Sequence, residues 1–242
     1  MNVYLRSELR RTLRNRRVLV LSILMPVILL LVYGQLGRGT INGADTAAYL
    51  MVSMAVFGSM SAAIGTGGQI ATERGLGWNR TLRLTPLSPN QYVATKVLLS
   101  MCLAVLPIAA VFAIGALVDH VQLAATTWLL VGLGCWLGAL PFAALGLVIG
   151  YVARPDSVQQ IGGLLYMLLS LFGGLWIPVE AMPHLMKAIS QWTPAYWVAQ
   201  LARAPIFPGN TVDWHTVLVV GLWTAGLAVI GVRRFQLDTA RA

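Results

Sequence analysis

Of the 242 residues, 57% are hydrophobic and only 10% are charged, whereas soluble domains carry roughly 25% charged residues. This composition argues against a soluble globular enzyme, a disordered chain and a coiled coil. The formal net charge of +9 comes from 17 Lys and Arg residues against 8 Asp and Glu residues. Because the basic residues flank apolar segments, they indicate anionic lipid headgroups, not nucleic acid, as their partner.

Residues 1–17 predict a basic amphipathic helix. Leucines recur every four residues on one face, and arginines occupy other positions of the helical wheel: Leu5, Leu9, Leu13, Arg6, Arg10, Arg14 and Arg17. Such a helix is suited to lying in the cytoplasmic interface of a membrane. The alternative is a simple positively charged anchor in which the leucines are incidental.

Six apolar stretches follow, each near the length that a helix needs to cross a bilayer. They cover about residues 18–36, 47–71, 93–118, 127–153, 158–179 and 214–232. Helices are favoured over barrel strands because no ten-residue alternation of apolar and polar residues occurs. The expected fold is an all-α integral membrane protein, with residues 1–17 as a cytoplasmic helix and residues 18–242 as one six-span domain.

Basic residues outside these stretches predict the orientation. Fourteen of the 17 fall on the side that holds both termini, and three fall on the other side: Arg38, Lys187 and Arg203. The positive-inside rule therefore places both termini in the cytoplasm. Five or seven spans would break this partition, and the long basic segment before the first span favours an uncleaved helix over a signal peptide.

Two connections are expected to contain short helices. In the cytoplasmic loop, residues 73–84 can form a helix with Thr72 as its N-cap, which Pro86 would end. The external segment 180–213 shows helical spacing of apolar residues on both sides of Pro194. It predicts a helical hairpin in the outer leaflet between the fifth and sixth spans, with its aromatic residues at headgroup level.

Small residues and prolines within the spans indicate how the helices pack. The fourth span contains Gly134-x-x-x-Gly138 and Gly146-x-x-x-Gly150, spacings that allow close approach of helices. Prolines inside spans predict kinks: Pro26, Pro107 and Pro141.

No residue pattern predicts catalysis, a metal site or a nucleotide site. The sequence has no P-loop motif, so no nucleotide site of that kind is expected in this chain. Neither the cysteines nor the histidines have metal-ligand spacing. No Asp, Glu, Lys or Arg lies in a span core, which argues against ion-coupled transport. Any transport energy would come from another chain, and uncharged spans suit an amphipathic or lipid-like substrate.

Two segments resemble a known family. They are Glu73-Arg74-x-x-Gly77 … Leu82-x-x-Thr85-Pro86-Leu87-Ser88-Pro89 and Gly173-Gly174 … Pro178 … Met182-Pro183 … Pro194-x-Tyr196. Their order and spacing resemble type-two ABC exporter permeases, the six-span subunits of bacterial drug, lipid and polysaccharide exporters. The sequence departs from that family at Thr95, where glycine is usual, and after Gly77, where an acidic residue is common.

The resemblance implies partners and a coupling site. It implies a dimer of a separate ABC ATPase that binds ATP and Mg, a second permease copy or paralogue, membrane lipids, and a place in a bacterial plasma membrane. The cytoplasmic loop would dock on the ATPase, through residues Glu73, Arg74, Gly77, Leu82, Thr85 and Pro86. Loop shaping alone is the alternative role for Gly77, Thr85 and Pro86.

The resemblance also implies that the second and fifth spans line the translocation path. Small, polar and aromatic residues on these spans are the candidates for its lining: Phe57, Ser61, Gln69, Tyr166 and Ser170. Helix packing alone is the alternative. The expected function is outward movement of an amphipathic drug-like or lipid-like substrate. Flipping of a lipid or polysaccharide, a structural or sensory membrane subunit, and a membrane-embedded enzyme remain alternatives.

Overall fold

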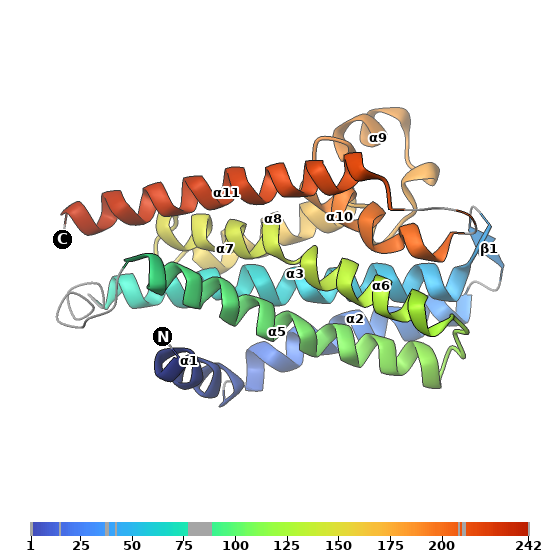
Figure 1. The fold of residues 1–242 in the computed structure, drawn as a ribbon, viewed down its shortest axis with the longest axis horizontal. Helices are drawn as coiled ribbons and strands as arrows, with labels where there is room; N and C mark the ends of the chain where they lie inside the picture. Colours follow the sequence, from blue (N-terminus) through green and yellow to red (C-terminus); the bar gives the residue numbers. More distant parts are fainter. Residues whose placement is uncertain are drawn as a thin grey trace.

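The computed structural model describes residues 2–14, 16–36, 39–41, 43–76, 89–207, 209 and 212–241. These residues form an elongated bundle of helices (Figure 1). The elements are α1 (Asn2–Arg14), α2 (Arg16–Leu36), β1 (Thr40–Ile41), β2 (Ala44–Asp45), α3 (Thr46–Gly75), α5 (Pro89–Leu117), α6 (Ala125–Leu137), α7 (Leu140–Val152), α8 (Val158–Phe172), α9 (His184–Ser190), α10 (Pro194–Arg203) and α11 (Trp214–Arg241), with 3-10 turns at Val179–Ala181 and Ala204–Ile206.

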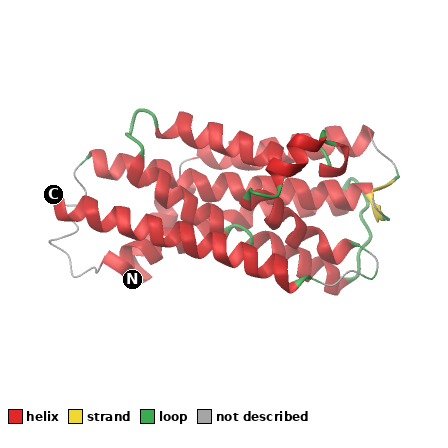
Figure 2. Ribbon diagram, turned by 90° about the horizontal axis from the view of Figure 1, so that it is seen from above, coloured by secondary structure: helices red, strands yellow, loops and turns green. Residues whose placement is uncertain are grey.

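Four of the described helical segments are long and apolar enough to cross a membrane: Thr46–Gly75, Gln91–Leu117, Ala125–Val152 and Trp214–Asp238. Ser22–Gly34 and Val158–Phe172 are shorter apolar helices. The expectation of a helical membrane protein is thus confirmed. A two-stranded antiparallel ribbon departs from the all-α expectation, with Thr40 paired to Asp45. Figure 2 shows this ribbon at the end of the bundle opposite to the two termini.

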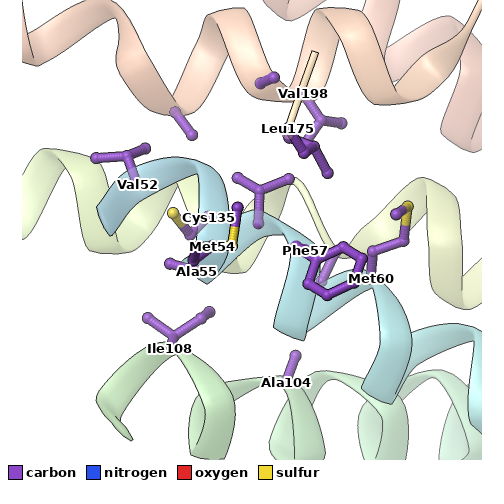
Figure 3. Packing of buried hydrophobic residues seen from close by; sticks show 14 of the residues in the cluster. Val52, Met54, Ala55, Phe57, Met60, Ala104, Ile108, Cys135, Leu175 and Val198 are labelled. Atoms are coloured by element: carbon purple, nitrogen blue, oxygen red, sulfur yellow. The ribbon is translucent and has the colours of Figure 1, made fainter. Parts of the chain in front are cut away.

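The central element is α3, which packs on α2, α5, α7, α8 and α10. Because α3 is apolar on all sides, it can be surrounded by other helices along most of its length. Figure 3 shows Met54, Phe57 and Met60 of α3 among side chains of neighbouring elements, including Ile108 of α5 and Val198 of α10. Met54 and Met60 are fully buried.

Glycines bring α3 and α7 into backbone contact. A Cβ atom on Gly67 would lie 2.5 Å from the Gly146 carbonyl oxygen, and one on Gly150 would lie 2.9 Å from the Gly67 carbonyl oxygen. The other predicted pair packs on α10, since a Cβ atom on Gly134 would lie 3.0 Å from the Ala202 Cα. Both glycine pairs of the fourth span therefore mark close helix contacts.

The structure refines one local prediction and corrects another. The stretch 127–153 lies within the apolar helical segment Ala125–Val152, which is interrupted between Leu137 and Leu140. Pro141, where a kink is predicted, lies in the first turn of α7, where its missing N–H costs no hydrogen bond. Thr72 is not an N-cap, because α3 continues to Gly75 and the Thr72 hydroxyl donates to the Gly68 carbonyl oxygen (2.9 Å). The predicted loop helix therefore does not begin at Glu73; residues 77–84 lie outside the described residues.

Candidate functional site

Charged side chains gather where α1, α3 and α5 meet. Lys96 of α5 is fully buried, and its Nζ donates to Glu8 Oε2 of α1 and to Glu73 Oε1 of α3, at 2.7 Å in both cases. The Tyr92 hydroxyl donates to the second oxygen of Glu73 at 2.8 Å. Both carboxylates are almost fully buried, so each has lost its hydration. Short charge-assisted hydrogen bonds compensate for this loss.

Helical spacing places these groups together. Glu73 lies in the last turn of α3, and Tyr92 and Lys96 lie one turn apart at the start of α5. Arg11 of α1 adds a second cation, with Nη1 3.4 Å from a carboxylate oxygen of both Glu8 and Glu73. We call Glu8, Arg11, Glu73, Tyr92 and Lys96 the charge cluster; its two cations balance its two carboxylates.

The leucine face of α1 packs on the protein. Leu5 and Leu9 contact the cluster formed by Ala62, Leu99 and Leu103. In addition, Thr12 and Gln69 are hydrogen-bonded through their side chains (3.2 Å). Leu13, at the end of this face, is exposed, and the position of α1 in the membrane interface stays a prediction. The opposite face carries exposed arginines: Arg6, Arg10 and Arg14.

Arg74, the residue after Glu73, ties the end of α3 to other helices. Its Nε and Nη2 donate to the two carboxylate oxygens of Asp238 in α11, at 3.1 and 3.2 Å. Its Nη1 donates to the Gly150 carbonyl oxygen at the end of α7 (2.8 Å). Adjacent residues therefore hold the end of α3 to α1 and α5 on one flank and to α7 and α11 on the other.

Of the six predicted coupling residues, the structure describes only Glu73 and Arg74; Gly77, Leu82, Thr85 and Pro86 lie outside the described residues. Sequence reasoning missed Glu8 and Asp238 and gave Lys96 no partner. One signal was available for Glu8: it is the first acidic residue of the chain, and it lies among the leucines of an otherwise basic helix.

A cavity of about 300 Å³ lies between α2, α3 and α8. Three predicted path residues line it: Phe57, Ser61 and Tyr166. The Phe57 and Tyr166 rings stack at 4.7 Å between centroids. Space is left by small residues, since a Cβ atom on Gly65 would meet no atom within 4 Å. The other two predicted residues lie elsewhere: Gln69 contacts α1, and Ser170 is buried with its hydroxyl donating to the Tyr166 carbonyl oxygen.

A third polar contact joins α10 to α3. Arg203 is buried, and its Nη2 donates to Ser53 Oγ (2.8 Å) and to the Gly174 carbonyl oxygen (2.6 Å). Its guanidinium lies 4.1 Å from the centroid of the Tyr49 ring. These neutral partners and the ring face stabilise the buried cation of Arg203, which belongs to the segment 180–213 that is predicted to be external.

Comparison with known proteins identifies the class. Residues 1–207 match the family described as "ABC-2 type transporter". The chain is also 35% identical over 217 residues to the Bacillus subtilis (strain 168) protein named "Putative transport permease YvfS", covering 88% of each chain.

The chain therefore belongs to the ABC-2 type transporter family. It is a multi-pass, non-catalytic permease subunit, and in such systems ATP is bound by a separate ABC ATPase.

Proposed function

We propose that this permease exports an amphipathic, drug-like or lipid-like substrate. The observation that carries the proposal is the cavity between α2, α3 and α8. Its described lining is mainly apolar and aromatic and has no charged side chain; its polar residues are Ser22, Ser61, Gln159 and Tyr166. Such a lining binds apolar surface and orients it through a few hydrogen bonds. It would accept acyl chains equally well, so flipping of a lipid is the second candidate.

The topology proposed is six spans, in which α2 and α8 join the four long helical segments. Both termini lie at one end of the bundle (Figures 1 and 2), as an even number of spans requires. The excess of basic residues on that side supports a cytoplasmic position in a bacterial plasma membrane, with α9 and α10 on the outside. A second permease copy would pack beside the cavity, where α8 exposes Leu164 and Met167.

Coupling is proposed to run through the loop 77–88 and the end of α3. A dimer of ABC ATPase subunits would contact the loop. Because the Glu73 carboxylate is buried in the charge cluster, its proposed role is to hold the loop in position, not to offer a free charge to the ATPase. Arg74 would act similarly on the other flank through Asp238.

The test is ATP hydrolysis by the permease reconstituted with its ABC ATPase, in the presence of amphipathic compounds or of lipids with fluorescent headgroups. We expect amphipathic compounds to stimulate hydrolysis and Ser61→Trp, which fills the cavity, to abolish stimulation without preventing assembly. Gly221→Trp is the control, because Gly221 faces open space on α11. Stimulation by labelled lipid alone would favour flipping, and an unchanged Ser61→Trp complex would place the path elsewhere.

A further inference from the structure

The charge cluster joins the end of α3 and the start of α5 to a third element, α1. Glu73 precedes the loop 77–88, Lys96 follows it, and Glu8 belongs to α1, which lies far away in the sequence. All three meet at the Lys96 Nζ. Figure 1 shows α1 across the side of the bundle, toward the end that carries the C-terminus. The helix α1 is therefore joined to the end of α3 and to the start of α5.

The energetic importance of Glu8 follows from the burial of the Lys96 ammonium, to which it is bound. A fully buried ammonium needs compensation for its lost hydration, and here two carboxylates provide it. Without the Glu8 charge, Lys96 retains Glu73, but α1 loses the 2.7 Å ionic bond that joins it to α5. The described contacts that α1 keeps include the packing of Leu5 and Leu9, the contact of Tyr4 with Tyr92, the long contact of Arg11 with Glu73, and the bond between Thr12 and Gln69.

We propose that Glu8 is a positioning residue for coupling: by docking α1 on Lys96 and Glu73, it fixes the end of α3 relative to the start of α5. A displacement of the loop then moves both spans and α1 together. If α1 were only a membrane anchor, its docked face would not affect the loop. The proposal rests on the proposed function for its coupling step, but the docking step can be measured on the permease alone.

The docking test measures how fast an impermeant maleimide labels a cysteine on the buried face of α1. The reporter is Thr12→Cys, in a permease carrying Cys102→Ser and Cys135→Ala, because Thr12 is 3% exposed. We expect Glu8→Gln to raise the labelling rate at least tenfold. The matched control is Glu180→Gln, the same change at an exposed position. A change of less than twofold for Glu8→Gln would overturn the proposal.

A double variant tests whether the residues act as one unit. The labelling rate of Glu8→Gln/Lys96→Met is compared with the rate calculated by multiplying the fold-changes of the two single variants. We expect the measured rate to be at least fivefold below the calculated one. The reason is that Lys96→Met removes the cation that Glu8→Gln leaves with too little compensating negative charge. Rates that multiply would contradict the proposal. If Glu8→Gln does not accumulate in membranes, accumulation of the double variant supports the interaction between Glu8 and Lys96. If neither variant accumulates, a purely positioning role for Glu8 is overturned.

The coupling test measures ATP hydrolysis per assembled complex of the permease with its ABC ATPase. We expect Glu8→Gln to lower the stimulated kcat at least threefold and to leave the KM for ATP unchanged, because the nucleotide site lies in the other chain. If the parental permease does not alter hydrolysis, the proposed function fails. If it does and Glu8→Gln behaves identically, only the present inference fails.

Discussion

Replacing Lys96 by methionine should destabilise the permease strongly. The two carboxylate oxygens bound to its Nζ lie at most about 5.4 Å apart, twice the 2.7 Å contact distance. Without the cation they repel each other by about 3 kcal/mol at an effective dielectric constant of 20. This agrees with the roughly 3–5 kcal/mol lost when one partner of a buried ionic group is removed. For a chain of this length we expect a fall in melting temperature of about 6–20 °C.

Thermal unfolding of the purified permease in nanodiscs measures this effect. The control is Lys187→Met, which removes the other lysine of the chain from the short helix α9 and should change the melting temperature by no more than a few degrees. Adding Glu8→Gln to Lys96→Met should recover part of the loss, because it removes one of the two repelling charges. Equal melting temperatures for Lys96→Met and the parental protein would refute the reasoning.

Three further predictions concern the rest of the bundle. Gly67→Ala should lower the free energy of unfolding by about 1–3 kcal/mol, because its Cβ would press on the Gly146 carbonyl oxygen. Gly65→Ala is the control and should leave the stability unchanged. Equal stability losses in thermal unfolding of the two variants would contradict the close contact at Gly67. Arg74→Ala should lower the free energy of unfolding by only about 1 kcal/mol, since the ion pair with Asp238 is partly exposed. It should nevertheless reduce the stimulation of ATP hydrolysis in the assembled complex. Stimulation equal to that of the parental permease would exclude Arg74 from the coupling path. In intact cells, cysteines placed at Ser88 and Gln191 of a permease lacking its native cysteines should label only at position 191; the reverse pattern would invert the topology.

Much of the helical fold follows from apolar length and composition. The stretch 93–118 corresponds closely to Gln91–Leu117, and Pro141 marked the break between α6 and α7. The end of α3 was misplaced because a threonine that resembles an N-cap is satisfied within the helix by the Gly68 carbonyl oxygen. The ribbon Thr40–Asp45 had a signal in Asn42-Gly43, a pair typical of hairpin turns, where Gly43 has a φ of 85°.

The charge cluster was harder to predict for a physical reason. Lys96 lies 88 residues from Glu8 and 23 from Glu73. Local periodicity shows which face of α1 carries Glu8, but only the packing of α1 on α5 brings it to Lys96. In the cavity, the choice of small, polar and aromatic residues on the second and fifth spans identified Phe57, Ser61 and Tyr166. The same criterion also selected Ser170, whose hydroxyl is satisfied by its own helix.

The most direct test of the central claim is ATP-dependent uptake of a fluorescent amphipathic compound into inverted membrane vesicles that contain this permease and its ABC ATPase. In such vesicles the cytoplasmic side faces outward, so export appears as accumulation inside. We expect accumulation that requires ATP and both chains, and that is lost with Ser61→Trp but retained with Gly221→Trp. Equal accumulation in vesicles that lack the permease would contradict the account.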